Sequence, residues 1–300
     1  MRFRQGSLTA FWMSLLLAGL CGPGCALFKQ PVIQSSTNKI PSLRPPPDAV
    51  ALDIVFVERP RGDELLGPKL WDQVDEVGSL SPSTRTMLRA NGLRVGVAGS
   101  DPPAALQTLL GLRTDFSYEP SAEQCKQLIG RQVMLRSGGE TEVLATPLIE
   151  QCRIRLPDVD DPEAPFQVRE YQAAHGLLRL TVHHVQQGWV RIDFVPELHH
   201  GNERLRHEAS DTGWQFTNRQ LVDPLYSQRF SLTLAVGEMV LLTGDRAIVT
   251  GETPVDTQPL GEMLFHSSDQ KSAIQRMLVI RASDLSKDAD LYANLKPSGS

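Results

Sequence analysis

The chain has 300 residues and a formal net charge of −5, so it has enough residues for one large domain or two modest ones. Hydrophobic residues make up 41% and charged residues 22% of the sequence, which is ordinary for a globular protein. Because the balance is acidic and the sequence has no basic run, nucleic acid is not an expected partner.

The first residues have the pattern of an export signal. Arg2 and Arg4 give a basic start, and residues 8–20 form an apolar block that is too short to cross a bilayer as a helix. No later stretch is long and uncharged enough to be a transmembrane helix. We therefore expect residues 1–24 to be a signal peptide and the protein to work outside the cytoplasm.

Two cysteines, Cys21 and Cys25, follow the apolar block. This arrangement resembles a bacterial lipoprotein signal, in which a cysteine that follows small residues is lipidated and becomes the new N-terminus. The small residues 22–24 precede Cys25, whereas the bulky Leu20 precedes Cys21. The resemblance predicts lipidation at Cys25, with Cys21 as the second choice. The alternative is ordinary cleavage, which would release a soluble exported protein.

Residues 25–48 have the composition of a tether. The segment 34–39 is polar, and residues 45–47 are three consecutive prolines, which favour a stiff polyproline conformation. A lipid-anchored protein needs such a spacer to hold its fold clear of the headgroups, and a disordered extension fits the same composition. The expected location is the periplasmic side of the cell envelope, with the protein anchored to a membrane by lipid.

Residues 49–112 are predicted to form a small α/β unit. Ser81 is a favourable N-cap, Pro82 fits the first turn of a helix, and Gly92 can end that helix in the left-handed conformation. An earlier helix would carry Leu70, Trp71, Val74 and Val77 on one side. In chain order we expect a strand at 49–57, helices that begin at Pro68 and Pro82, a strand at 93–97, and a helix from Asp101 to Gly111.

Residues 130–283 alternate with a period of two and are predicted to form a larger, mostly antiparallel β domain. We expect one hairpin at 132–136 and 141–145 around a glycine turn, a strand at 166–173, a second hairpin at 177–186 and 189–198, a polar loop at 201–213, and strands at 230–236, 239–243 and 276–281. Residues 284–300 are predicted to be a disordered tail. The expected fold class is α+β.

The second hairpin is predicted to turn at Gln187-Gly188, which places Gln186 opposite Trp189. In this pairing, Leu178, Leu180 and Val182 share a face with the charged residues Arg191, Asp193 and Glu197. The opposite face mixes apolar residues with Arg179 and His183. Two mixed faces indicate a sheet that protein covers in part and water in part.

The same pairing bears on the histidines, since six of the seven lie between His175 and His207. It places His175 opposite His200, and two facing imidazoles lie close enough to share a metal ion. No cysteine or patterned carboxylate completes a ligand set, and polar strand ends explain the histidines more simply. We expect no bound metal and no cofactor, with His175 and His200 as weak candidates.

Cys125 and Cys152 are the cysteines that remain after the signal. They flank the predicted hairpin at 132–145, whose outer ends would bring them together, and an oxidising envelope permits a disulfide. Such a bridge would stabilise the fold by about 3 kcal/mol in the chain-entropy model. Two separate buried thiols are the equally open alternative.

Known catalytic motifs are missing from the sequence. His207-Glu208 lacks the second histidine of a zinc-protease helix, and residues 96–100 have the spacing of neither a nucleophile elbow nor a dinucleotide loop. We therefore expect a protein that is not an enzyme. An envelope hydrolase with an unrecognised site is an alternative hypothesis.

Residues 165–281 have a linear pattern that resembles the C-terminal domain of bacterial secretins, the outer-membrane gates of secretion and pilus systems. The matching elements are the strand pair at 176–198, Gly237-Glu238 before a strand that closes on Gly244, the Leu260-Gly261-x-x-Phe265 element, and the final strand at 277–281. The segment before Leu260 departs from the family pattern, and at most residues 49–112 match a secretin's small N-terminal modules.

Together these observations predict a membrane-tethered envelope protein with a non-enzymatic binding or scaffolding role. Its expected partners are the membrane, through the lipid anchor, and an envelope protein that the sequence does not identify. The resemblance to secretins implies an alternative, an assembly component of a secretion or pilus-type system.

Overall fold

The structure is a computed structural model that describes residues 48–112, 129–156, 166–210, 213–245, 256–266 and 273–283. All of them belong to one compact unit, Pro45–Ser300. The predicted signal peptide, both candidate lipidation sites Cys21 and Cys25, the tether up to residue 47 and the tail 284–300 lie outside the described residues. In the described ranges, no helix has the length and apolar character needed to cross a membrane.

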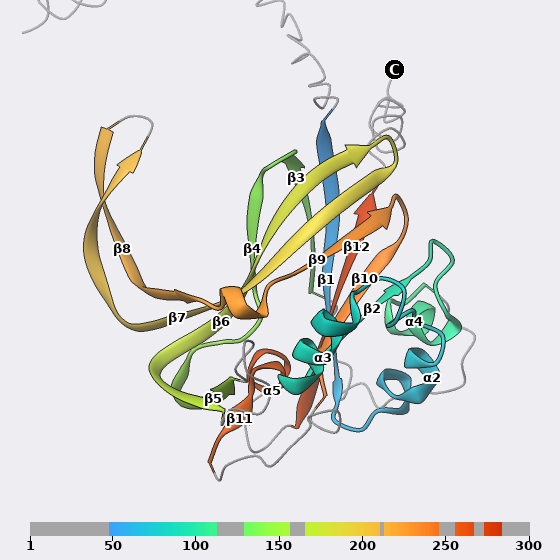
Figure 1. Cartoon of the computed structure of the whole chain (residues 1–300), viewed down its shortest axis with the longest axis horizontal. Coiled ribbons are helices and arrows are strands. Elements are labelled where there is room, and N and C mark those ends of the chain that lie inside the picture. The colour runs from blue at the N-terminus through green and yellow to red at the C-terminus, as the bar shows by residue number, and fades with distance from the viewer. Residues whose placement is uncertain are drawn as a thin grey trace, which may run out of the picture. The chain divides into compact units, whose positions relative to one another are not determined.

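Two β-sheets dominate the fold, as the α+β prediction requires (Figure 1). The first sheet has the order β2 (Leu93–Ala98), β10 (Met239–Gly244), β12 (Ile274–Ser283), β1 (Ala49–Pro60), β3 (Ile129–Arg136). The second has the order β11 (Gln258–Pro259), β5 (Ile149–Leu156), β6 (Gln167–Gln186), β7 (Trp189–Ser210), β8 (Gly213–Pro224), with β4 (Glu140–Leu144) on β6 and β9 (Phe230–Ala235) on β7. All pairings are antiparallel except the short β5–β11 contact.

The first sheet is covered on both faces. One face packs on the second sheet, and their shared core contains Leu52, Val240, Leu278, Leu180 and Phe194. The other face packs on the helices η1 (Glu64–Leu66), α2 (Pro68–Trp71) and α4 (Ala104–Leu109), in a second cluster with Leu70, Leu106, Leu241 and Val279. Strands that are buried on both faces read as continuous apolar runs, which explains the composition of β1 and β10.

The stretches 49–112 and 130–283 do not form separate sheets. β1 and β2 come from the first stretch, but β10 and β12 from the second lie between them. The structure therefore joins both stretches in one unit. A sequence pattern identifies strands but carries no information on which distant strand inserts between two others.

The helices begin largely where the sequence predicts. In α3 (Pro82–Ala90) the Ser81 side chain accepts a hydrogen bond from the Thr84 backbone, and Gly92 has a φ of 68°. The predicted helix from Pro68 is shorter than expected. α2 ends at Trp71, because Asp75 pairs with Val97 in a β-bridge, and Val77 is exposed.

The predicted hairpin at 132–145 is wrong, although its turn is in the expected place. β3 pairs with β1 in the first sheet, and β4 pairs with β6 in the second. The glycine turn at 137–139 carries the chain from one sheet to the other, with Gly138 at a φ of 84°. A tight turn fits either a hairpin or such a corner, so the turn signal did not fix the partners.

The β6–β7 hairpin forms as predicted, but its register is shifted by one residue. Gln186 faces Trp189, as expected, whereas His184 already faces Val190, so Val185 is an extra, bulged residue. The bulge brings the apolar side chains of both strands onto one face, which also holds His184 near the turn. The other face is mostly polar but includes Leu177 and Val195, so the prediction of two mixed faces is corrected for one of them. The apolar face includes Leu178, Leu180, Val182, Val190, Ile192 and Phe194, and all of these are buried.

The Leu260-Gly261-x-x-Phe265 element is a short helix, α5 (Leu260–Phe265), that lies against β10, β2 and β6. A Cβ atom at Gly261 would lie 2.0 Å from the carbonyl oxygen of Gly92, and one at Gly244 would lie 2.2 Å from the carbonyl oxygen of Gly261. Glycine is therefore required at these positions by the close approach of the backbones.

Residues 201–213, predicted to be a polar loop, mostly form strand. β7 continues to Ser210 and β8 begins at Gly213, and η2 (Tyr226–Gln228) follows β8. The polar composition of this segment indicated a loop. The segment is polar because it extends away from the core as a strand. We call residues 200–210 and 213–221, the described part of this hairpin beyond the body of the second sheet, the arm.

Candidate functional site: a docking surface on the arm

The arm branches from the second sheet where β6 and β7 separate. Their pairing ends at His175 and His199, and β6 then pairs only with β5. Two residues with positive φ mark the branch, Ala173 at 46° and Gly201 at 75°. β7 also carries extra residues between His200 and Arg204 relative to β8. Bulges of this kind bend a strand and redirect it, so the arm leaves the plane of the sheet (Figure 1).

Side chains hold this branch point together. The Gln220 amide donates to the carbonyl oxygens of Ala173, at 2.8 Å, and Gly201, at 2.7 Å. Both carbonyl groups belong to the positive-φ residues at which β6 and β7 separate. A backbone group left unpaired in a buried place is costly, so Gln220 stabilises the branched geometry.

A second contact ties the base of β8 to β6. The Tyr171 hydroxyl donates to Asp223 at 2.6 Å, and Arg169 forms an ion pair with the same carboxylate at 3.1 Å. Burial raises the pKa of Tyr171 to about 12, and the hydrogen bond to Asp223 adds to this effect. The phenol is therefore a fixed donor at all physiological pH values, and the root of the arm is rigidly attached.

The arm has one apolar face. Leu205 lies opposite Asn218, and His207 lies opposite Phe216. Since side chains two residues apart share a face of a strand, Trp214 joins this set. The rings of His207 and Phe216 meet edge to face with centroids 4.0 Å apart. On the opposite face Arg204 lies across from Arg219.

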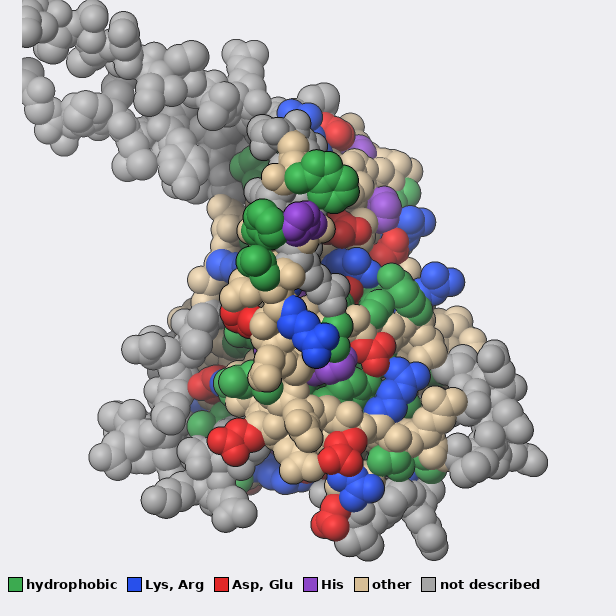
Figure 2. Space-filling view, turned by 90° about the vertical axis from the view of Figure 1, so that its left-hand side faces the viewer, with side chains coloured by type: hydrophobic (Ala, Val, Ile, Leu, Met, Phe, Trp, Pro, Cys, Tyr) green, Lys and Arg blue, Asp and Glu red, His purple; other side chains and the backbone are tan. Residues whose placement is uncertain are grey.

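This face is open to solvent. Leu205 is 66% exposed, Trp214 77% and Phe216 63%. Among the described elements, β8 packs mainly on β7. Its contacts with β6 include those of Gln220 and Asp223 at the base of the arm. Figure 2 shows hydrophobic side chains gathered around a histidine over the arm, on the side that faces the viewer. Clustered exposed apolar side chains mark interaction surfaces, so we define Leu205, His207, Trp214 and Phe216 as the apolar patch.

The predicted histidine pair has changed partners. Because of the Val185 bulge, His175 faces His199 instead of His200, with ring centroids 5.4 Å apart. Burial lowers the pKa of His175, and the neighbouring His199 lowers it further. His200 instead packs edge to face on Tyr171. Among the described residues, no three His, Cys, Asp or Glu side chains are grouped so that they hold a metal ion.

The polar face of β6 and β7 is paired internally. The buried carboxylate of Glu197 meets Arg179 at 3.0 Å and His199 at 3.3 Å, and His183 meets Asp193 at 3.0 Å. Each of these acidic groups has a basic partner in place. The arrangement places His183 in a cross-strand pair with Asp193, and His199 beside Glu197 of its own strand.

Cys152 lies on β5 and is buried, with no disulfide partner among the described residues. Burial raises the pKa of its thiol to about 11, so the reactive thiolate is rare at neutral pH. Cys125 lies outside the described residues, and the hairpin that was expected to bring the two cysteines together does not form. The disulfide stays a prediction.

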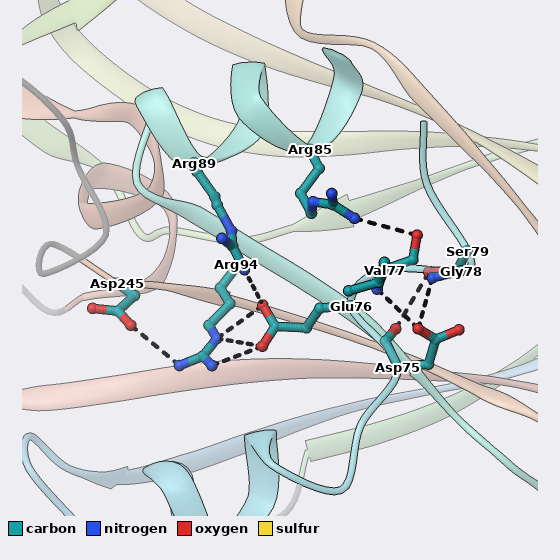
Figure 3. Close-up of polar contacts among 9 residues, drawn as sticks. All are labelled: Asp75, Glu76, Val77, Gly78, Ser79, Arg85, Arg89, Arg94 and Asp245. Carbon is teal, nitrogen blue, oxygen red and sulfur yellow. Dashed lines mark hydrogen bonds and ion pairs between the residues drawn. The ribbon is translucent and has the colours of Figure 1, made fainter. Parts of the chain in front are cut away.

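A separate charged network surrounds Glu76 and Arg94 (Figure 3). The Glu76 carboxylate accepts hydrogen bonds from Arg94 at 2.7 Å and from Arg89 at 3.2 Å, and Arg94 also meets Asp245 at 3.4 Å. The Arg94 guanidinium lies 4.4 Å from the centroid of the Trp71 ring. The network joins the segment after α2 to β2 and to the end of β10, so we interpret it as a structural clamp.

Sequence reasoning missed the apolar patch. Leu205 and His207, and likewise Trp214 and Phe216, stand two residues apart, and this alternation is the signal of a strand with one apolar face. Polar and charged neighbours on the other face hid the alternation. The sequence Asp211-Thr212-Gly213, flanked by two such segments, was the available clue to a hairpin.

No protein-family model and no curated protein sequence matches the chain. Among solved structures, the InvG secretin-domain β-barrel of the Salmonella SPI-1 injectisome is 10% identical, with a TM-score of 0.20 over 84% of this chain and 69% of that chain. The type II secretin GspD of enteropathogenic Escherichia coli is 11% identical, with a TM-score of 0.20 over 84% and 77%. GspD in its pilotin complex with AspS, from ETEC, is 12% identical, with a TM-score of 0.20 over 82% and 49%. The chain thus has a weak structural resemblance to secretin domains.

Proposed function

We propose that the protein is an exported, membrane-tethered protein of the cell envelope with a non-enzymatic binding or scaffolding role, and that the arm is its contact surface. The observation that carries the proposal is the apolar patch on a two-stranded ribbon that the body holds in place through Gln220 and Tyr171. The tether and the lipid anchor at Cys25 remain expectations from the sequence.

Contact is the role that fits this surface best. An isolated two-stranded ribbon is marginally stable in water. Exposure of three large apolar side chains to water on one face of such a ribbon is also unfavourable. Burying each of Leu205, Trp214 and Phe216 against a partner would contribute about 1.5–3 kcal/mol. Burial of the patch would therefore favour binding of a partner. The contact of its single histidine, His207, among the described arm residues is with the ring of Phe216, and not with a carboxylate or a nucleophile.

The alternative function is a secretin-like assembly component. It is supported by the linear order of sequence elements between residues 165 and 281, which belong to β6, β7, β10, α5 and β12. This proposal predicts stable multimers of the chain. The proposed binding role predicts that the arm contacts a different component of the envelope.

Site-specific photo-crosslinking in cells tests the proposed role. We expect a crosslinker at Leu205 or Phe216 to give adducts with a component of the membrane fraction. Val77 is the matched control, because its exposure of 67% is close to the 66% of Leu205, but it lies after α2 instead of on the arm. Equal labelling from positions 205 and 77 would contradict the proposal, and a ladder of chain multiples would favour the secretin-like alternative. Mass measurement of the mature N-terminus tests the anchor, and an unmodified terminus elsewhere than Cys25 would refute it.

A further inference from the structure

Three separate segments lie at one end of the fold. In Figure 1 the start of β1, the β6–β7 turn and the ends of the arm strands at Ser210 and Gly213 all lie at the top. Hydrogen bonds support part of this arrangement, since the Ser137 backbone donates to the Asp48 carbonyl at 3.1 Å and the His184 backbone donates to the Ser137 hydroxyl at 3.0 Å. The point where the predicted tether joins the fold is thus next to the β6–β7 turn.

Each of the other two segments exposes apolar side chains at this end. At the β6–β7 turn, Val185 is 56% exposed and Trp189 is 40% exposed. On the arm, the patch contributes Trp214 and Phe216. Tryptophan is the residue most characteristic of membrane–water interfaces, because its ring is amphipathic.

We propose that this end of the protein rests on a lipid bilayer, with the apolar patch of the arm and the Val185–Trp189 turn inserted at the interface. The inference rests on the proposed function and names the partner of the same surface. In it, the predicted tether is a flexible link to the anchor instead of a spacer that holds the fold clear of the headgroups. Charges near this end are of mixed sign: Arg136 pairs with Ala49, next to Asp48, and the sequence of the hairpin that forms the arm includes Arg206, Glu208 and Asp211. Insertion of apolar side chains therefore drives binding, and anionic headgroups are not needed.

The geometry orders the depth of the side chains. Trp214 is the second residue of β8 and stands nearest the tip of the arm. Phe216 and Leu205 stand progressively farther from the tip, and each step of two residues along a strand covers about 6.6 Å. Interfacial segments enter the bilayer to a depth of about 5–10 Å. Trp214 is therefore inserted most deeply, and Leu205 stays near the headgroups.

Fluorescence quenching by brominated lipids tests this inference. The probe is the lipidated mature chain in vesicles of phosphatidylcholine that carry bromine on their acyl chains, with unbrominated vesicles as the reference. Removal of the signal leaves Trp71, Trp189 and Trp214, and Trp71 is buried and serves as the internal control. We expect bromine to quench Trp214 most, Trp189 less and Trp71 least, as assigned with the variants Trp189→Phe and Trp214→Phe.

The double variant Leu205→Ser/Phe216→Ser is the matched test of the patch. We expect it to remove most of the Trp214 quenching while the lipid anchor still holds the protein on the vesicles. Unquenched Trp214 in vesicle-bound wild-type protein would overturn the inference. If crosslinks from the arm then reach a different protein, the proposed contact role survives and the lipid assignment alone is lost. Crosslinks to a second copy of this chain would instead favour the secretin-like alternative.

Discussion

The two halves of β7 show how one strand can serve two purposes. Residues 189–199 place Ile192 and Phe194 in the core, whereas the arm half places Leu205 in solvent. Both halves alternate apolar and polar residues and both pair with antiparallel neighbours. They differ in what covers the apolar face, since the first sheet covers one half and no described element covers the other.

The difference shows that exposure of the arm is built into the fold. Ala173 and Gly201 take positive φ angles at the branch, and Gln220 satisfies both of their carbonyl groups. Backbone strain and a dedicated side chain are features that a frayed strand end does not need. We conclude that the branch holds the apolar patch away from the core.

The comparison is sharpest for two phenylalanines of β7 and β8. Phe194 is buried and stacks on Phe230 with centroids 4.6 Å apart, so Phe194→Ala is expected to lower the free energy of unfolding by about 3–5 kcal/mol. Phe216→Ala, on the exposed patch, should change it by less than about 0.5 kcal/mol. Urea denaturation of the mature protein in detergent measures both. Similar losses for the two variants would show that the arm packs on the body.

A smaller effect is expected from the branch point. Gln220→Met leaves the carbonyls of Ala173 and Gly201 without their donor, which should cost about 1–2 kcal/mol locally. We expect faster hydrogen exchange in the arm with the core unaffected. Gln132→Met, on the exposed strand β3, is the control and should leave arm exchange unchanged. Uniform acceleration through both sheets would mean that the arm is no separate unit.

Gly201 provides a related test of the bend. Its φ of 75° disfavours any residue with a Cβ atom, yet no heavy atom would lie within 4 Å of that Cβ. Gly201→Ala should therefore cost only the conformational penalty, about 1 kcal/mol. Thermal unfolding and arm exchange together measure it. No loss of stability, together with unchanged arm exchange, would show that the left-handed bend is not required.

The stability of the fold should also decrease at acidic pH because of His266. Burial lowers the pKa of His266, and the nearby Arg61 lowers it further, while Glu262 and Asp245 oppose the change. The unfolded chain therefore binds the proton more readily, so the stability is complete above the unfolded histidine pKa of about 6.5 and falls as the pH drops below it. His266→Asn should flatten this dependence in unfolding experiments, with a residual slope from His175. An unchanged slope would contradict the assignment.

Sequence reasoning located local structure better than pairing. The N-cap at Ser81, the turn at Gly188 and the strand beginning at Ala49 follow from local chemistry and are present. The single bulged residue Val185 escaped it, because a bulge leaves the alternation on each side intact and changes only the relation between the two sides. That one residue decided both the faces of the hairpin and the partner of His175.

The candidate site escaped prediction for a related reason. In a half-buried strand, apolar residues alternate with polar ones. The arm has the same alternation, but charged residues such as Arg204 and Glu203 stand next to it. Composition therefore indicated a loop, while the spacing of Trp214 and Phe216 indicated a strand. Only the separation of β6 from β7, which depends on tertiary contacts at Gln220, shows that this strand leaves the core.

Hydrogen–deuterium exchange of the lipidated mature protein tests the central claim most directly. Exchange is compared between detergent and phosphatidylcholine vesicles. The account predicts that vesicles protect the arm segments 204–210 and 213–219 and the turn at 185–189, while β2, β10 and α4 exchange at unchanged rates. Unprotected arm segments in vesicle-bound protein, or protection centred on α4 and β2, would contradict it.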